Sequence, residues 1–354
     1  MRLRARLAIF FAIGCLATVA LHADGAEERK LRSLVDDALL ELGFDPAQKV
    51  DLDGGSVLSV GLADIERQPN ELTVGAVMML VRRPLAVVAQ ALVNDASFRV
   101  NTDILDYRAI GDGSESREEI EAVFSGIGYA EEESDEVAKL LRVKAGSEFN
   151  LSSREIGEFR SLGGTKNGTR ESVSAKTADL LRERLLAYLD NGLESVEPYA
   201  RSGGKTASPR RELTVAFSAL ELLERYFPAF YTGLLRFPEP LPDDTLSRFY
   251  WIKRRASGRP TYVLAHRLEQ HRDDYTIAAE LHFYVGHSYN SMLTVIACVP
   301  VEAGTLVLSA NRLFTDKVTG FGSSLKKRIG RRQIVDAMAE HFEALRNELA
   351  KPGS

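Results

Sequence analysis

Four histidines in the last third of this 354-residue chain are the side chains best suited to chemistry: His266, His271, His282 and His287. An imidazole can act as a general acid or base, bind a metal ion, or donate a hydrogen bond to a polar ligand. The spacing contains neither His-x-His nor His-Glu-x-x-His, so we predict no metal site and no cofactor. An enzyme of the hydrolase or cyclase type would use His266 or His287 as its general acid–base, beside a carboxylate such as Glu280.

Two short motifs resemble catalytic loops but lack the surroundings that those loops need. Residues 202–206 end like a phosphate-binding loop, yet they lack its first glycine and follow a helical pattern rather than a strand. Residues 286–290 resemble a nucleophile elbow, but Asn290 replaces the final glycine and a strand-like apolar run follows. No motif in the chain therefore identifies a reaction.

The first 23 residues have the order of a secretory signal peptide. Three arginines within the first six residues precede an apolar run over 7–21, and small residues follow up to Ala23. The run of about 15 residues is shorter than the roughly 20 that span a bilayer as a helix. We expect cleavage near Ala23 and export to the periplasm or the medium. An uncleaved membrane anchor and a lipoprotein attached through Cys15 remain as alternatives.

The composition is typical of an acidic domain with a large core. The chain has 45 Lys and Arg against 50 Asp and Glu, a net charge of −5, and losing the three leader arginines leaves 42 − 50 = −8. This balance argues against nucleic acid as a partner. Without Cys15 the chain keeps only Cys298, which cannot form an intramolecular disulfide and which we expect to be a small buried residue.

Hydrophobic spacing divides the rest of the chain into three blocks, 24–110, 111–245 and 246–350. The first block predicts helices at 31–42 and 84–95 and strands at 56–62, 72–81 and 102–110. The second predicts a helical insertion, with helices at 172–197 and 211–226. The third predicts strands at 248–254, 261–271, 275–285, 291–299 and 305–313 and a closing helix at 333–349.

The predicted fold class is α+β, a curved antiparallel sheet gripped by a long C-terminal helix. Loops between the late strands are too short for parallel crossovers, so these strands must be antiparallel neighbours. The closing helix has one apolar face, built from Ile334, Met338, Phe342, Leu345 and Leu349. Laying that face on the concave side of the sheet buries both, and a strongly curled sheet would leave a cavity between them.

Several short patterns carry a resemblance to known proteins. They are Phe249-Tyr250-Trp251, His266, His287, Asn311-Arg312 and Gly320-Phe321-Gly322. In these patterns the chain resembles an uncharacterised family of exported bacterial proteins. The order of strand 72–81, a helix opened by Pro84, the meander and the closing helix also resembles the helix-grip fold of the START and polyketide-cyclase-like superfamily. That second resemblance implies an apolar pocket for a lipid-like ligand.

We therefore expect an exported protein that binds a lipid-like or other apolar small molecule between the sheet and the C-terminal helix. The residues expected to line or gate that cavity are Tyr250, Trp251, His266, His287, Tyr289 and Arg312. Besides the enzyme considered above, an envelope protein-interaction module that docks a partner through residues 111–245 is a further alternative. The basic residues Lys326, Lys327, Arg328, Arg331 and Arg332 are suited to peripheral contact with an anionic membrane.

Overall fold

The computed structural model describes residues 33–61, 67–146, 148–164, 168–319 and 323–351. The leader with Cys15, and the segment Gly320-Phe321-Gly322, lie outside the described residues. Within the described ranges no helix combines the length and the apolar character needed to cross a bilayer.

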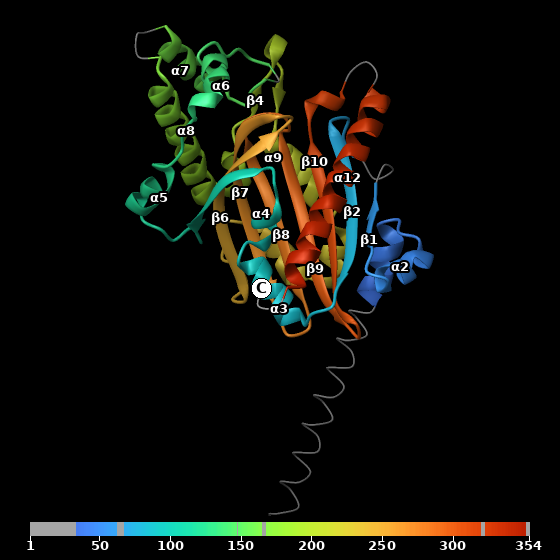
Figure 1. Cartoon of the computed structure of the whole chain (residues 1–354). Helices are drawn as coiled ribbons and strands as arrows, with labels where there is room; N and C mark the ends of the chain where they lie inside the picture. The colour runs from blue at the N-terminus through green and yellow to red at the C-terminus, as the bar shows by residue number, and fades with distance from the viewer. Residues whose placement is uncertain (1–32, 62–66, 147, 165–167, 320–322, 352–354) are drawn as a thin grey trace, which may run out of the picture.

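One eight-stranded antiparallel sheet organises the molecule, in the order β1-β2-β10-β9-β8-β7-β6-β3 (Figure 1). The strands are β1 (Val57–Val60), β2 (Glu71–Val81), β3 (Ile104–Gly111), β6 (Thr245–Ala256), β7 (Arg259–His271), β8 (Thr276–Val285), β9 (Ser291–Val301) and β10 (Gly304–Phe314). The predicted α+β class is confirmed, and β6 to β10 form the expected antiparallel meander. Strands of the first block complete the sheet on both sides, with β2 beside β10 and β3 beside β6.

Helices account for most of the remaining elements. After a helical stretch at 33–41 come α2 (Lys49–Asp53), α3 (Leu85–Val93), α4 (Ala96–Val100), α5 (Arg117–Phe124), α6 (Ser134–Leu140), α7 (Ser153–Gly163), α8 (Arg170–Asn191), α9 (Pro209–Phe217), α10 (Glu221–Tyr226), α11 (Pro228–Arg236) and α12 (Ser323–Leu349). Within the insertion, β4 (Tyr199–Ala200) and β5 (Thr206–Ala207) form a two-residue pair. The single helix predicted at 211–226 is divided in two, because Leu220 leaves the helical region of backbone space.

The closing helix begins earlier than predicted, at Ser323 rather than near position 333. Its first residues are mostly polar and have no buried apolar face, so the hydrophobic pattern alone does not reveal them. The buried side chains of α12 are Phe342, Leu345 and Leu349, all near its C-terminal end. The helix packs along β2 and β1 and against α4, which places it at one side of the curl rather than across the middle of the sheet.

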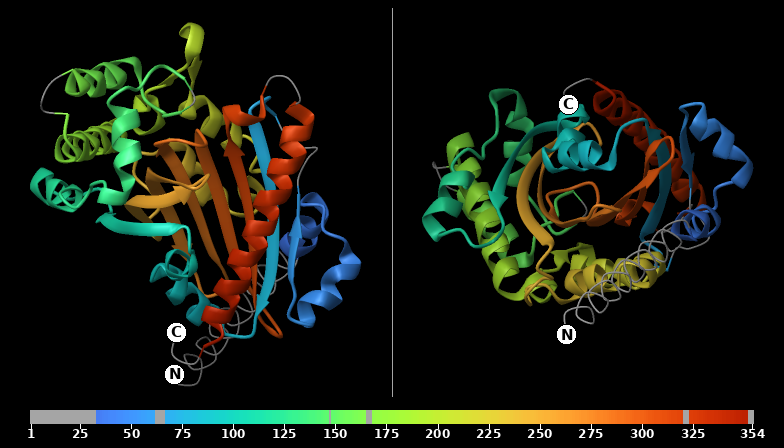
Figure 2. Two further views of the ribbon diagram at one scale, coloured as in Figure 1. Left: turned by 45° about the horizontal axis from the view of Figure 1, so that its top comes forward. Right: turned by 90° about the horizontal axis from the view of Figure 1, so that it is seen from below.

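The sheet curls so that its two faces meet different helices (Figure 2). On the inner face, α3 and the end of α12 cover apolar side chains of β2, β9 and β10. On the outer face, helices of the insertion share one hydrophobic cluster with β6 to β10. In that cluster Tyr188 of α8 stacks on Phe283 of β8, with ring centroids 3.9 Å apart. The insertion is therefore packed on the outer face of the sheet along a continuous core.

Candidate functional site

Strand alternation separates the two aromatic residues that we expected to share a pocket. Tyr250 lies on the inner face, where its hydroxyl donates to Oδ1 of Asp95 at 3.1 Å. Trp251 lies on the outer face, where Nε1 donates to the carbonyl oxygen of Val123 at 3.0 Å. Both are buried and hydrogen-bonded, so each has a structural role where it lies.

His266 is also buried on the outer face, inside an aromatic cluster. Its ring stacks on Phe249, with centroids 4.3 Å apart, and its two nitrogens lie 3.1 Å from the hydroxyl oxygens of Tyr188 and Ser247. Burial lowers the pKa of the imidazole to about 3. A neutral ring whose nitrogens both have partners is suited to packing, and proton transfer near neutral pH is outside its range.

His287 lies in the loop between β8 and β9, remote from His266. Its Nε2 is 3.0 Å from the carbonyl oxygen of Pro260, and its Nδ1 is 2.6 Å from the hydroxyl oxygen of Ser288. Burial, together with the nearby Arg259 guanidinium, lowers the pKa of the ring to about 4. This histidine therefore fixes the loop.

Glu280, the carboxylate proposed beside a catalytic histidine, lies on the inner face and pairs with neither His266 nor His287. Its Oε2 accepts from Nε and Nη2 of Arg267, at 2.9 and 2.6 Å. Burial alone would raise the pKa of the carboxyl, but Arg267 and His282 bring it down to about 2. The histidine in contact is His282, with Nε2 3.1 Å from Oε1 of Glu280.

His282 also connects this carboxylate to the predicted pocket residue Tyr289. The Nδ1 atom of His282 lies 2.8 Å from the tyrosine hydroxyl oxygen. Burial lowers the pKa of this histidine as well. The resulting chain of Glu280, His282 and Tyr289 lies on the inner face, where His282 and Tyr289 are buried and Glu280 is partly exposed. The sequence singled out His282 as one of four histidines suited to chemistry but did not place it in the expected pocket.

A polar band crosses the inner face at the level of these residues. The register of the strands aligns Asn311, Thr294, Glu280, Arg267 and Arg248 in one row across the sheet. Apolar clusters border the band on both sides. The space between sheet and C-terminal helix is therefore crossed by ion pairs, and its surface is less apolar than the helix-grip resemblance implies.

The apolar pocket described by the structure lies on the opposite, outer face of the sheet. Its volume is about 330 Å³, and its floor is formed by outward-facing side chains of β8, β9 and β10. These floor residues are Ile277, Leu293, Val295, Ala297, Leu308 and Ala310. The walls come from the helical stretch at 33–41 and from α10 with the residues directly before and after it, including Leu34, Leu220, Leu223 and Phe227.

One end of this outer pocket is polar. Arg312, a predicted pocket residue, lines it there and is ion-paired with the fully buried carboxylate of Glu71. Arg67 lies at the same end, with Nη2 3.1 Å from Oε1 of Glu221 and Nη1 donating to the carbonyl oxygen of Ser218 at 2.7 Å. The pocket thus combines a mostly apolar surface with two guanidinium groups at one end.

Polar contacts hold the N-terminal wall of the outer pocket in place. Arg225 of α10 donates to Asp37 at 3.0 Å and to Glu41 at 2.9 Å. The hydroxyl of Tyr226 donates to Asp37 at 2.6 Å. The Arg225 pairs are partly exposed and each contributes little to stability, so this wall is held less firmly than the floor.

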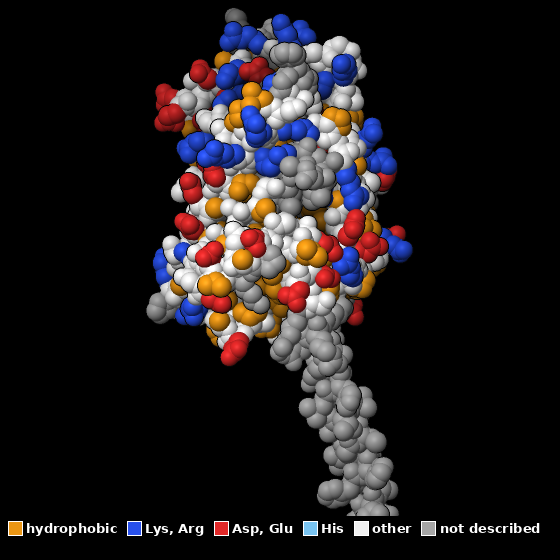
Figure 3. Space-filling view, turned by 90° about the vertical axis from the view of Figure 1, so that its right-hand side faces the viewer, with side chains coloured by type: hydrophobic (Ala, Val, Ile, Leu, Met, Phe, Trp, Pro, Cys, Tyr) orange, Lys and Arg blue, Asp and Glu red, His pale blue; other side chains and the backbone are white. Residues whose placement is uncertain are grey.

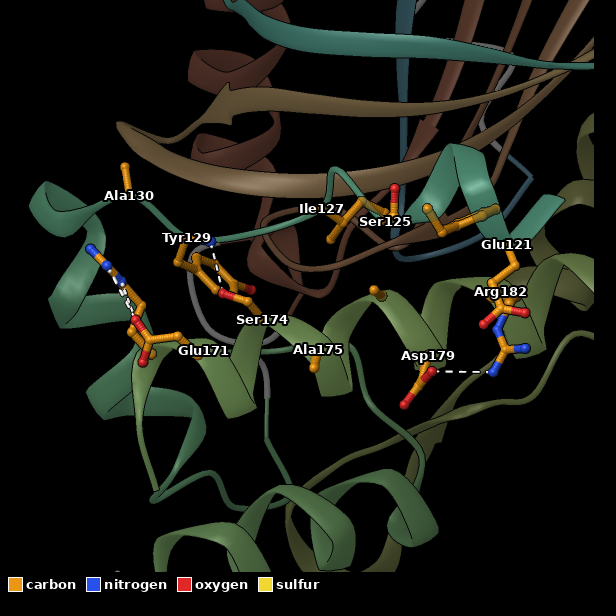
Figure 4. Close-up of a pocket in the computed structure, with 13 residues that line it drawn as sticks. Glu121, Ser125, Ile127, Tyr129, Ala130, Glu171, Ser174, Ala175, Asp179 and Arg182 are labelled. Carbon is orange, nitrogen blue, oxygen red and sulfur yellow. Dashed lines mark hydrogen bonds and ion pairs between the residues drawn. The ribbon is translucent and has the colours of Figure 1, made fainter. Parts of the chain in front are cut away.

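A second, larger pocket lies on the insertion, between α5 and α8 (Figure 4). It has a volume of about 730 Å³ and is lined by both charged and small side chains. Ser174, Ala175 and Ala178 lie on the side formed by α8, and Ser174 accepts from the backbone of Tyr129 at 3.0 Å. The charged side chains include the ion pair of the half-buried Arg182 and the exposed Asp179, 3.1 Å apart.

The remaining sequence-predicted residues lie outside both pockets. Of the basic cluster on α12, Lys326, Arg328 and Arg332 are exposed, and Lys327 and Arg331 are half-buried. Cys298 is fully buried on the inner face, where burial raises the pKa of its thiol to about 12. Among the described residues, no group of three His, Cys, Asp or Glu side chains could hold a metal ion.

The pocket floor was not recognised in the sequence, although a signal was present. Leu293, Val295 and Ala297 alternate along β9 with residues of the inner face, and the small Ala310 lies on the neighbouring strand. Small side chains between larger apolar ones leave space above a sheet that a covering helix must fill. Glu71 and Arg67 gave no comparable signal, because the side chains with which they form ion pairs, Arg312 and Glu221, lie more than 100 residues away along the chain.

Comparisons with known proteins add little to this geometry. The chain matches no protein-family model, and no curated protein matches it. One similar solved structure is the X-ray crystal structure of protein CV1439 from Chromobacterium violaceum, which is 14% identical. The alignment covers 33% of this chain and 89% of that chain, with a TM-score of 0.15, too low to support any inference about fold or function.

Proposed function

We propose that this chain is an exported protein that binds an apolar or amphipathic small molecule in the outer pocket. The observation that supports the proposal is the pocket itself, about 330 Å³ with a floor of aliphatic side chains. Its volume lies in the range of ligand sites, and its composition of apolar walls with a few polar groups is typical of them. The proposal keeps the ligand class predicted from the sequence and moves it to the other face of the sheet.

The polar end indicates an anionic or strongly polar head group. Arg67 and Arg312 both lie there, and each already contacts a glutamate, Glu221 and Glu71 respectively. Of the two arginines, Arg67 is better placed to release its glutamate and bind the acidic group of a ligand instead. Its ion pair with Glu221 is exposed, whereas the ion pair of Arg312 with Glu71 is buried. A ligand with an acidic head and a hydrocarbon tail would place the tail on Val295 and Leu308.

The proposal is tested by titrating the folded protein with a homologous series of dansylated straight-chain fatty acids. Each added methylene should tighten binding about fourfold, since burial of one is worth about 0.8 kcal/mol, until the pocket is full. Ala310→Phe fills the floor and should abolish binding, while Ala337→Phe, on an exposed position of α12, should leave it unchanged. Equal binding by both variants, or no binding by the folded wild type, would reject the pocket as a ligand site.

The head-group assignment has its own control. Arg67→Gln should weaken binding of the fatty acid, while the corresponding fatty alcohol should bind both proteins alike. If acid and alcohol lose affinity equally in this variant, Arg67 only supports the shape of the pocket.

The second pocket, between α5 and α8, supports a second candidate function, that of an envelope protein-interaction module. A helix that presents Ser174, Ala175 and Ala178 allows another backbone to approach closely, and the charged pairs around it could orient that partner. Crosslinking in the native envelope, with Ala178→Arg as the blocking variant, tests this role. An unchanged crosslinking pattern for that variant would remove this candidate.

A further inference from the structure

The first half of α12 concentrates positive charge. Residues 323–335 contain five Lys and Arg and no Asp or Glu. Residues 336–349 contain four acidic residues and a single base, Arg346. The net charge therefore changes from 5 − 0 = +5 in the first half to 1 − 4 = −3 in the second half.

This charge order opposes the electrostatic preference of a helix. The N-terminal end of a helix carries a partial positive charge, which acidic side chains stabilise and basic ones destabilise. The first turn of α12 contains no acidic residue, and Lys326, Lys327 and Arg328 follow directly. Helix stability alone therefore gives no reason for this arrangement, whereas an anionic partner does.

Two large aliphatic side chains lie exposed within the same basic segment. Leu325 is 52% exposed and Ile329 is 51% exposed. They are four residues apart, so they lie on one stripe of the helix. Lys326 and Arg328 flank this stripe and are themselves exposed. An apolar stripe bordered by bases is typical of a helix that lies in a membrane interface.

We propose that the first half of α12 binds the surface of an anionic phospholipid membrane. Leu325 and Ile329 would enter the interface between head groups and acyl chains, with the bases contacting lipid phosphates. Seen from the side, Lys and Arg gather over the upper half of the molecule, where α12 begins in Figure 1 (Figure 3). Nucleic acid fits this surface less well, because the whole chain has a net charge of −5 and exposed aliphatic side chains add nothing to phosphate binding.

The test is co-flotation of the full chain with phosphatidylcholine vesicles that do or do not contain phosphatidylglycerol. The variant Lys326→Gln/Arg328→Gln/Arg332→Gln should lose about a hundredfold in partitioning to the anionic vesicles, about fivefold for each base. The matched control, Arg170→Gln/Arg236→Gln/Arg272→Gln, removes three exposed bases from other surfaces and should bind as the wild type does. Equal loss in both variants would show that only net charge matters and would overturn the assignment to α12.

A label on the stripe separates this contact from binding by the apolar leader, which all variants share. In a Cys15→Ser background, Ile329→Cys carries an environment-sensitive dye, and Leu246→Cys, at a position 49% exposed, serves as the control. The buried Cys298 should not react. Emission from the dye at position 329 should shift to the blue with anionic vesicles only, and the control should not shift. Vesicle binding without that shift would refute the proposed contact.

Discussion

Glu212 on α9 is a buried carboxyl group whose ionisation should destabilise the fold at neutral and alkaline pH. Only 4% of the residue is exposed, and burial raises the pKa of its side chain from 4.5 to about 7. Three donors oppose that effect: Asn70 at 2.6 Å and Asn290 at 2.8 Å to Oε1, and Ser291 at 2.7 Å to Oε2. The loss of water outweighs the three hydrogen bonds, so the carboxyl group stays protonated to a higher pH than in the unfolded chain.

The size of the effect follows from the two pKa values. The folded state binds the proton more tightly, so the stabilisation is complete below pH 4.5 and is lost as the pH rises through about 7. At about 1.4 kcal/mol for each pKa unit, the loss amounts to about 3 kcal/mol. Glu212→Gln keeps the same shape, since its Oε1 can still accept from both asparagines and its amide can donate to Ser291. This variant should match the wild type near pH 4 and exceed it by about 3 kcal/mol near pH 8.

Urea denaturation at a series of pH values measures this difference directly. Subtracting the curve of the variant from that of the wild type removes the contributions of all other titrating groups. Glu302→Gln, at an exposed position, is the control for loss of one surface carboxylate. Parallel curves for wild type and Glu212→Gln would mean that the three donors keep the carboxylate ionised, and the reasoning from burial would be refuted.

Three further predictions concern buried groups. Arg184→Met leaves the Glu155 carboxylate buried without its arginine partner and should lower the free energy of unfolding, measured by urea denaturation, by about 3–5 kcal/mol. Adding Glu155→Leu to this variant should restore most of the lost stability. A loss below about 1 kcal/mol for Arg184→Met would contradict this prediction. Gly75→Ala places a Cβ 2.1 Å from a backbone oxygen of β1 at a φ of +143° and should cost about 3 kcal/mol or more, whereas Gly126→Ala, with nothing within 4 Å, should change the melting temperature little. Burial lowers the pKa of His266 from 6.5 to about 3, so the contribution of this histidine to stability decreases as the pH falls below 6.5. His266→Phe should therefore reduce the loss of stability between pH 7 and pH 5 by about 2 kcal/mol. An unchanged loss would mean that the folded ring takes up a proton.

The sequence was sufficient to predict the meander because loop length restricts strand pairing strongly. Loops as short as those between β7, β8, β9 and β10 permit only antiparallel neighbours, and the predicted strand at 261–271 differs from β7 by two residues. The start of α12 was missed for the opposite reason. Its first residues do not form a buried apolar face, so no hydrophobic periodicity in the sequence indicates that they are helical.

Which side chains share a face was harder to predict than which residues form strands. Simple alternation along β8 predicts that His282 and Tyr284 share one face and that Phe283 and Val285 share the other. The structure has a bulge opposite Leu264 and Ala265, and beyond it Phe283 and Tyr284 both pack on the outer cluster while Val285 lies inside. A bulge shifts every later residue to the other face, and the sequence of one strand does not show where its neighbour will allow one.

The two faces of the sheet differ in what they can bind, which bears on where an apolar ligand can lie. On the inner face, a hydrocarbon ligand would have to lie against Arg267 and Glu280. Removing water from these charged groups is unfavourable, and a hydrocarbon makes no hydrogen bonds that would offset this cost. On the outer face, Val295 and Leu308 are aliphatic and only partly buried, so covering them with a hydrocarbon chain is favourable. The same alternation that places Thr294 in the polar band places Val295 in the pocket floor. An apolar ligand should therefore bind beneath the N-terminal wall and α10, and only substitutions on that face of the sheet should weaken its binding.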